Sequence, residues 1–216
     1  MIHGLTVKIC GLTSAEDALA AARAGAGCLG FIFYPKSPRA LTMEQFRALA
    51  RRLPAAPKRA AVLVEPGLTE ITAAQQAGFD FIQIHFQTSV PLARLREWSE
   101  LIGPARLWLA PKLPPETDLS PLLLPLAETF LLDTFHAEKF GGTGETGDWS
   151  KFRRHRTACP GKTWVLSGGL NPGNLAAAIA ATGASFADLN SGVEAAPGVK
   201  DHAKLQALAD RLWTYP

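Results

Sequence analysis

Three observations on the sequence predict an α/β protein in which parallel strands close into a barrel. Short apolar runs alternate with longer Ala- and Leu-rich amphipathic stretches along the whole chain. The runs are almost continuously apolar, which is typical of parallel strands that are covered on both faces. Eight such runs fit within the 216 residues, the size and rhythm of a single (β/α)8 TIM barrel over residues 1–216.

Each predicted strand is a run of five or six mostly apolar residues between turn or helix signals. In chain order the predicted strands are Leu5–Cys10, Cys28–Phe33, Arg59–Val64, Asp80–His85, Ala105–Ala110, Thr129–Asp133, Thr163–Ser167 and Ser185–Asn190. Polar residues interrupt the apolar pattern of the fourth run, Asp80–His85.

Capping signals predict the first helices between the strands. Ser14, with Asp17 three residues later, predicts a capping-box-like helix start, and Gly25 can end that helix. Thr42 as N-cap, with Gln45 at the third helical position, predicts a capping box for the next helix.

The second half of the chain has weaker helix signals. Pro172 is predicted at the first position of a helix that ends at Gly183, and a last helix is predicted over 201–213. Prolines make the fifth connection irregular or only briefly helical; they are Pro111, Pro114, Pro115, Pro121 and Pro125.

An open doubly wound sheet is the alternative architecture. Such a sheet usually has fewer strands, and its G-x-G-x-x-G signature does not follow the first strand here. The barrel is therefore preferred. In a barrel the functional residues lie at the C-terminal ends of the strands and in the loops that follow.

Composition excludes several classes of protein. The chain has 22 Lys+Arg against 19 Asp+Glu, so its net charge of +3 disfavours nucleic-acid binding, and 47% apolar residues exclude disorder. Three scattered cysteines are too few for a disulfide framework or a structural zinc site. With no signal peptide and no run long enough to span a membrane, we expect a cytoplasmic protein.

Cys10 and Lys8 are the first candidates for chemistry. Side chains alternate along a strand, so apolar Val7 and Ile9 suit the helix side and place Lys8 and Cys10 inside the barrel. The ammonium of Lys8 is expected to lower the pKa of the Cys10 thiol and make it a usable proton acceptor. The alternative is a small buried hydrophobic residue, which suits Cys28 and Cys159 better.

Asp133 ends the sixth predicted strand after a run of apolar residues. A carboxyl group that loses water there has a raised pKa and can act as a general acid. The alternative is a helix cap or a structural ion pair, with Arg39 or Lys8 as the partner.

Glycine-containing loops follow the last two strands. The phosphate sites of this fold are often built from those two loops, where glycines let the backbone approach an anion. The alternative is that these glycines only form turns, as they do in the loops of any barrel. A third glycine-rich loop, 141–147, lacks the GK[ST] ending of a nucleotide loop and is interpreted as a mobile lid.

Arg39, Gln83 and His85 are further candidates. The planar guanidinium of Arg39 could hold a carboxylate bidentately, although a solvated surface arginine is the alternative. Gln83 and His85 alternate onto one face of the fourth strand and are expected to look inward, and a core histidine is the alternative. The basic run 153–156 is interpreted as a solvated helix face. No metal-ligand pattern is present.

Five segments, in order and over nearly the whole chain, resemble the phosphoribosylanthranilate isomerase family. They are VKICGLT, GFIFYPKSPRAL, LLDTF with GGTGETGDW, LSGGLNPGNL and DLNSGVEAAPGVKD. The resemblance implies an Amadori rearrangement of N-(5'-phosphoribosyl)anthranilate to 1-(2-carboxyphenylamino)-1-deoxyribulose 5-phosphate. This is the third step of tryptophan biosynthesis from chorismate, and it needs no cofactor. The implied partner is this small phosphorylated substrate, and the implied assembly is a monomer or a homodimer.

The resemblance also implies roles for individual residues. Asp133 would protonate the ribose ring oxygen, and Cys10 would remove the C2' proton. Arg39 would hold the anthranilate carboxylate and Asp188 would orient the ribose, with Lys8, Gln83 and His85 completing the substrate-binding wall. The residues implied to cradle the phosphate are Gly168, Gly169, Ser191 and Gly192.

The chain departs from the family pattern at some positions. Phe86 follows His85 where a turn is usual, so Phe86 is expected to alter the anthranilate pocket. The fifth strand usually carries an inward lysine, and here its only lysine is Lys112. The departures around His85 motivate one alternative, a degenerate barrel that binds a phosphorylated ligand or partner without isomerase activity. Two enzyme alternatives are another phosphosugar barrel, which should change Arg39, and a Schiff-base aldolase, which is disfavoured because no lysine ends the sixth strand.

Overall fold

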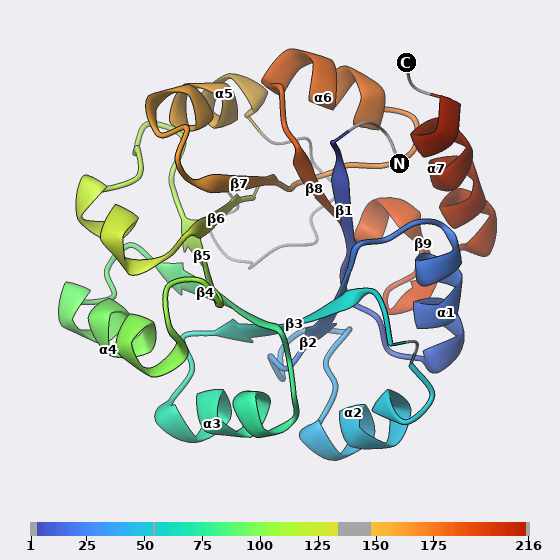
Figure 1. Ribbon diagram of the computed structural model, residues 1–216, viewed down its shortest axis with the longest axis horizontal. Coiled ribbons are helices and arrows are strands. Elements are labelled where there is room, and N and C mark those ends of the chain that lie inside the picture. The colour runs from blue at the N-terminus through green and yellow to red at the C-terminus, as the bar shows by residue number, and fades with distance from the viewer. Residues whose placement is uncertain (1–3, 54, 134–147, 215–216) are drawn as a thin grey trace.

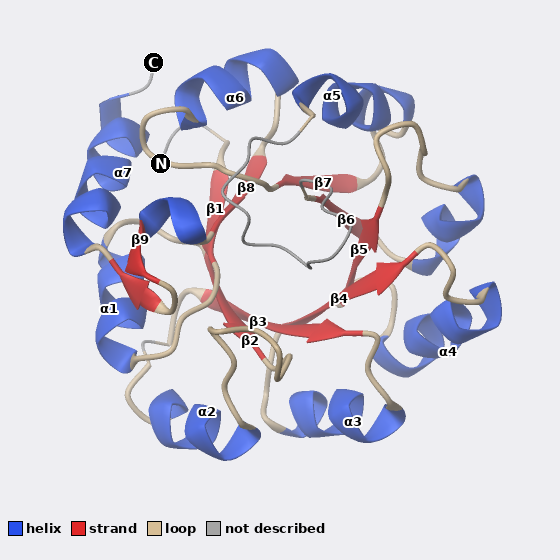
Figure 2. Ribbon diagram, turned by 180° about the vertical axis from the view of Figure 1, so that it is seen from behind, coloured by secondary structure: helices blue, strands red, loops and turns tan. Residues whose placement is uncertain are grey.

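The computed structural model describes residues 4–53, 55–133 and 148–214, and its central feature is a closed barrel of eight parallel strands (Figure 1). Neighbouring strands follow chain order, and β1 closes the barrel by pairing with β8 through four register partners, Lys8 opposite Asp188 among them. The helices form a ring around the barrel (Figures 1 and 2). The predicted (β/α)8 fold is therefore confirmed.

The strands of the barrel are short, and their observed bounds lie within two residues of the predicted ones. They are β1 (Thr6–Ile9), β2 (Cys28–Ile32), β3 (Lys58–Val64), β4 (Phe81–Gln87), β5 (Leu107–Lys112), β6 (Thr129–Leu132), β7 (Thr163–Leu166) and β8 (Phe186–Leu189).

The outer ring consists of seven α-helices in the described ranges. They are α1 (Ala15–Arg23), α2 (Met43–Ala50), α3 (Leu68–Gln76), α4 (Leu92–Ile102), α5 (Trp149–Ala158), α6 (Leu175–Thr182) and α7 (His202–Thr214). The proline-rich fifth connection forms only a short 3₁₀ helix, η1 (Pro121–Leu126). None of the helices in these ranges has the length and apolar character that crossing a bilayer would require.

A small extension of the last barrel unit was not predicted. After β8 the chain forms a short 3₁₀ helix, η2 (Ser191–Val193), and then an antiparallel hairpin of β9 (Glu194–Ala196) and β10 (Val199–Lys200). This hairpin stands outside the barrel sheet beside α1 (Figure 2). It leads directly into α7.

The capping predictions are confirmed at α2 and partly corrected at α1. Thr42 Oγ1 accepts from the backbone N–H of Gln45 at 3.1 Å, and the Gln45 side chain accepts from the Thr42 N–H at 2.7 Å. Ser14 caps α1, but the carboxylate of Asp17 does not return the bond. It bonds instead to the Lys200 N–H on the hairpin, at 3.1 Å, because the hairpin packs against this end of α1.

The predicted start of α6 is wrong. Pro172 lies in a turn before the helix, and Asn174 is the N-cap. The side chain of Asn171 accepts from the N–H groups of Gly173 and Asn174, and the Asn174 side chain accepts from the Asn171 N–H. These side-chain bonds satisfy the backbone locally and so compete with an earlier helix start. The predicted end is confirmed, because Gly183 has φ 65°.

Two apolar layers fix the position of the barrel. The larger one lies between the strands and the helices, and the smaller one fills the barrel interior. Within the interior, Trp108 packs against Phe81 and Phe186, with ring centroids 4.9 and 5.3 Å apart. These three aromatic residues lie near the N-terminal ends of their strands, so they close that end and leave the C-terminal end for polar side chains.

Candidate active site

A pocket opens at the C-terminal end of the barrel and gathers side chains from distant parts of the chain. Of the eleven catalytic, substrate-binding and phosphate-binding residues that the resemblance implies, all within the described ranges, Lys8 alone does not line the pocket, because Lys8 is fully buried. The others that line the pocket are Cys10, Arg39, Gln83, His85, Asp133, Gly168, Gly169, Asp188, Ser191 and Gly192.

Lys8 and Cys10 point into the barrel, as the strand alternation predicts. Lys8 Nζ donates a hydrogen bond to Asp188 Oδ2 at 2.8 Å, which makes a buried ion pair between β1 and β8. Gly30 on β2 leaves room for both side chains. A Cβ at Gly30 would lie 2.8 Å from Lys8 Cε and 2.9 Å from Cys10 Sγ.

Burial decides the protonation of the Cys10 thiol. Loss of water raises the pKa of Cys10, the nearby Lys8 ammonium lowers it, and the first effect is the larger. The pKa of Cys10 therefore lies above its usual value, and the expectation that Lys8 would bring it below that value is wrong. Lys8 itself stays charged: burial acts to lower its pKa, but Asp188 together with the nearby thiols of Cys10 and Cys28 outweighs burial and raises the Lys8 pKa above its usual value.

Asp133 follows the last residue of β6, and its half-buried side chain lines the pocket. Ser167, which follows β7, donates from its hydroxyl to Asp133 Oδ1 at 3.3 Å. Both cations that the sequence offered as structural partners bind other carboxylates: Lys8 binds Asp188, and Arg39 binds Glu194. Asp133 lines the pocket at the end of β6, three strands from β1 around the barrel.

Gln83 and His85 form a polar pair on the inner face of β4. Gln83 Nε2 lies 2.7 Å from His85 Nε2. Burial and the charge of Lys8 lower the pKa of His85 to about 3, so its ring is neutral and can accept this bond. Among the described residues, buried Gln83 Oε1 and Asp188 Oδ1 have no hydrogen-bond partner, and both side chains line the pocket.

The loops after β7 and β8 meet at the pocket rim. Gly168 and Gly169 have φ 97° and 60°, a backbone conformation that favours glycine. Gly192 in η2 packs so tightly on the carbonyl oxygen of Leu170 that a Cβ would collide with it. The two loops therefore contact each other backbone to backbone, and Ser191 lies beside them in the pocket wall.

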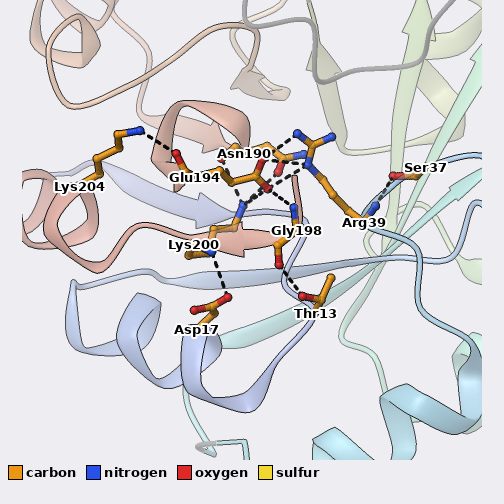
Figure 3. Close-up of polar contacts among 9 residues, drawn as sticks. All are labelled: Thr13, Asp17, Ser37, Arg39, Asn190, Glu194, Gly198, Lys200 and Lys204. Carbon is orange, nitrogen blue, oxygen red and sulfur yellow. Dashed lines mark hydrogen bonds and ion pairs between the residues drawn. The ribbon is translucent and has the colours of Figure 1, made fainter. Parts of the chain in front are cut away.

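Arg39 reaches the pocket from the loop after β2 and is held there by the hairpin (Figure 3). Arg39 Nε donates to Glu194 Oε1 at 2.9 Å, and Nη2 donates to Oε2 at 2.7 Å. The solvated surface arginine is thus excluded. Sequence reasoning missed Glu194 and Lys200, and their one signal was a pair of opposite charges flanking a Pro-Gly turn signal.

Two other expectations concern β4 and β5. Phe86 packs against Trp98 on α4, with ring centroids 5.9 Å apart, so it faces the helices and does not line the pocket. The expectation that Phe86 alters the pocket is wrong, because it alternates with the inward-facing His85. Lys112 lies on the same face of β5 as the interior residues Trp108 and Ala110, so this strand does carry an inward-side lysine.

The sequence predicts a mobile lid over 141–147 and no metal site. The proposed lid lies outside the described residues. Within the described ranges, no group of three His, Cys, Asp or Glu side chains is arranged to hold a metal ion.

A family model described as N-(5'-phosphoribosyl)anthranilate (PRA) isomerase matches residues 7–211. The chain belongs to this isomerase family. An N-(5'-phosphoribosyl)anthranilate isomerase of Syntrophus aciditrophicus is 38% identical over 204 residues, which cover 94% of this chain and 84% of that protein. The protein is accordingly an isomerase, and the family resemblance seen in its motifs is confirmed.

Solved structures of this isomerase family have the same architecture. The crystal structure of the Thermus thermophilus enzyme has a TM-score of 0.80 and 32% identity, and the alignment covers 97% of this chain and 99% of that one. Another structure of the family, at 31% identity and a TM-score of 0.75, contains reduced 1-(o-carboxyphenylamino)-1-deoxyribulose 5-phosphate; that alignment covers 98% of this chain and all of the other.

Proposed function

We propose that the protein catalyses the Amadori rearrangement of N-(5'-phosphoribosyl)anthranilate by general acid–base catalysis, with Asp133 as the acid and Cys10 as the base. The observation that carries this proposal is that one pocket holds both side chains, on strands from different sides of the barrel. An aldose–ketose isomerisation requires one group that gives a proton and one that removes a proton from carbon.

The first step opens the ribose ring. Asp133 gives its proton to the ring oxygen, the bond between C1' and that oxygen breaks, and the nitrogen lone pair forms the C1'=N bond of a Schiff base. Asp133 is placed for this step by Ser167, whose hydroxyl donates to Oδ1.

The second step removes the C2' proton. The Cys10 thiolate takes this proton, the electrons of the C–H bond form the C1'=C2' double bond, and the electrons of C1'=N return to nitrogen. The resulting enolamine becomes the ketone when C1' gains a proton and the C2' hydroxyl loses its proton to solvent, so that the C1'=C2' double bond is replaced by C2'=O. The buried Lys8 ammonium stabilises the thiolate electrostatically, although burial keeps the Cys10 pKa above its usual value.

Polar groups around the pocket suit the rest of this substrate. The backbone of the loops that contain Gly168, Gly169, Ser191 and Gly192 would bind the phosphate, because N–H groups at close-packed glycines can approach an anion. Gln83 Oε1 and Asp188 Oδ1 are buried acceptors, and sugar hydroxyls are donors that would satisfy them. Arg39 would bind the anthranilate carboxylate.

The direct test is the fluorescence decay of freshly made N-(5'-phosphoribosyl)anthranilate when the purified protein is added. Cys10→Ser and Asp133→Asn should each lower kcat by about 100-fold or more with little change in KM, because each removes a proton-transfer group. Arg39→Ala should raise KM instead. Wild-type turnover by Cys10→Ser would show that another group is the base.

The alternative of a degenerate barrel predicts a different result. Such a protein would bind the phosphorylated ligand without turnover and would not support growth of an isomerase-deficient tryptophan auxotroph. Phe86, the departure that suggested this alternative, packs against the helix layer, which removes one reason for it. We therefore favour an active enzyme that works in the cytoplasm on a small phosphorylated substrate.

A further inference from the structure

The guanidinium of Arg39 is held by a single carboxylate at the edge of the pocket. Both Arg39 and Glu194 are buried, with exposed fractions of 8% and 7%. Nε and Nη2 of Arg39 bind the two carboxylate oxygens side by side, at 2.9 and 2.7 Å (Figure 3). This paired geometry fixes the plane of the guanidinium as well as its position.

Glu194 is fixed in its turn by the hairpin on which it lies. Lys200 Nζ donates to Glu194 Oε1 at 2.9 Å, and the Gly198 N–H donates to the same oxygen at 3.3 Å. Lys200 Nζ also donates to the backbone and side-chain oxygens of Asn190, at 3.2 and 3.1 Å. The Lys200 backbone is tied to Asp17 on α1. The hairpin is thus anchored to two barrel units.

The protonation of the cluster agrees with this geometry. Burial acts to raise the pKa of Glu194, but the hydrogen bonds from Arg39 and the charge of Lys200 outweigh it, so the pKa lies below its usual value. Glu194 is therefore an anion that two cations share.

The stem of Arg39 is also constrained. Gly11, directly after Cys10, has φ +71°, and a Cβ there would lie 2.8 Å from Arg39 Cδ and 2.5 Å from Asn190 Oδ1. Glycine therefore allows Arg39 to pass over the backbone next to the Cys10 thiol. The distance between the arginine and the thiol is fixed by packing as well as by the ion pair.

One side of the guanidinium remains for a ligand. Glu194 occupies Nε and one side of Nη2, whereas Nη1 donates no hydrogen bond to any residue in the described ranges. Arg39 lines the pocket, and Nη1 is the guanidinium nitrogen that Glu194 leaves available to a ligand there. A carboxylate accepts well from two neighbouring N–H groups of one guanidinium.

We propose that Glu194 and Lys200 are positioning residues, which hold Arg39 so that its outer edge selects a substrate with a carboxylate. The inference rests on the proposed function and adds the source of its specificity. The hairpin carrying these two residues lies outside the barrel sheet, and its role is to supply the counter-charge for Arg39. Without Glu194, the long arginine side chain would regain rotamer freedom and lose its orientation.

The experiment compares two substrates on the same variants: N-(5'-phosphoribosyl)anthranilate and N-(5'-phosphoribosyl)aniline, which lacks the carboxylate. In Glu194→Gln, KM for the carboxylated substrate should rise roughly tenfold, the scale of one charge-assisted hydrogen bond, with kcat nearly unchanged. KM for the aniline compound should stay constant. A merely structural role would weaken both substrates alike.

Three further variants make the test specific. Glu97→Gln removes the exposed ion pair with Arg94 on α4, 3.3 Å long, and serves as the matched control that should change neither KM. Lys200→Met removes the hydrogen bond from Lys200 to Glu194 and keeps the ion pair between Glu194 and Arg39. This variant should therefore lower the preference for the carboxylated substrate by a smaller factor. It also carries the test if Glu194→Gln does not fold. In Arg39→Ala, the added Glu194→Gln change should have no further effect on the preference.

The outcomes separate this inference from the proposed function. If the wild-type protein turns over the carboxylated substrate and folded Glu194→Gln keeps the wild-type preference, the positioning role is wrong and the function stands. Additive effects of Arg39→Ala and Glu194→Gln would also overturn it. If calorimetry shows that the wild-type protein binds neither substrate and no turnover occurs, both the proposed function and the positioning role fail.

Discussion

Two opposing effects act on the Cys10 thiol, and their balance determines how it can serve as a base. Burial in the barrel disfavours the thiolate, and the Lys8 ammonium favours it. The charge of Lys8 is shared between Cys10 and Asp188, because Lys8 Nζ also binds Asp188 Oδ2 at 2.8 Å. The result is a thiol that is a strong base once ionised but is ionised in only a small fraction of molecules at neutral pH.

This balance predicts the pH dependence of the reaction. Below the pKa of a group, its ionised fraction rises about tenfold for each pH unit. In wild-type protein the loss of the Asp133 proton offsets the ionisation of Cys10 as the pH rises, so the slope is measured in Asp133→Asn, which lacks the titrating acid. Because the Cys10 pKa lies above its usual value, the residual log kcat/KM of this variant should rise with a slope near one from about pH 6 to about pH 8. Steady-state rates over this range measure the slope. A profile that is already level at about pH 6 would contradict the assignment of Cys10 as the base.

Packing between neighbouring strands controls the same side chains. Gly30 on β2 faces Lys8 and Cys10 on β1, and no side chain larger than hydrogen fits between them. The glycine therefore belongs to the site although it carries no chemical group.

Gly30→Ala should show this effect. The added methyl group would displace Lys8 or Cys10, so kcat should fall on the order of 10- to 100-fold, and the free energy of unfolding should fall by about 1–3 kcal/mol. Gly161→Ala is the control, since a Cβ at Gly161 meets no atom within 4 Å. Steady-state kinetics and urea unfolding measure both effects. Equal activity in the two variants would mean that β1 and β2 adjust without cost.

The elements differ in how far the sequence could predict them. Strands such as Thr163–Leu166 follow from a local apolar pattern, and the α2 cap follows from Thr42 and Gln45 alone. The role of Glu194 could not be predicted in this way, because its partner Arg39 lies 155 positions earlier in the chain. The start of α6 was misplaced because the Asn171 and Asn174 side chains compete with the helix.

In the molecule as a whole, core packing and the candidate active site lie at opposite ends of the barrel. Aromatic packing around Trp108 fills the N-terminal end, and titratable side chains collect at the C-terminal end. The sequence predicted only the C-terminal half of this division, because the barrel rule assigns function to the C-terminal strand ends, and it gave no prediction of the aromatic packing at the other end. It could not predict the protonation of these groups, since burial and charge from several strands determine it together.

Buried histidine should make the folded state sensitive to acid. The pKa of His85 is about 3 in the folded protein and about 6.5 in an unfolded chain. Below pH 6.5 the unfolded chain binds a proton that the folded protein excludes, so stability falls as the pH falls toward 3. The pocket keeps His85 in partial contact with solvent, so we expect a loss of about 1–2 kcal/mol between pH 7 and pH 5.

His85→Gln tests this prediction, because glutamine does not titrate. Urea unfolding of both proteins at pH 7 and pH 5 gives the two changes in the free energy of unfolding. The variant should lose less stability than the wild-type protein over this interval. Equal losses would assign the acid sensitivity to other groups.

The aromatic layer of Phe81, Trp108 and Phe186 limits how substrate enters the barrel and how product leaves it. Because this layer closes the N-terminal end of the barrel, the product must leave through the same opening that admits the substrate. Substrate therefore cannot bind until product has left, and accumulated product competes directly with substrate for the pocket.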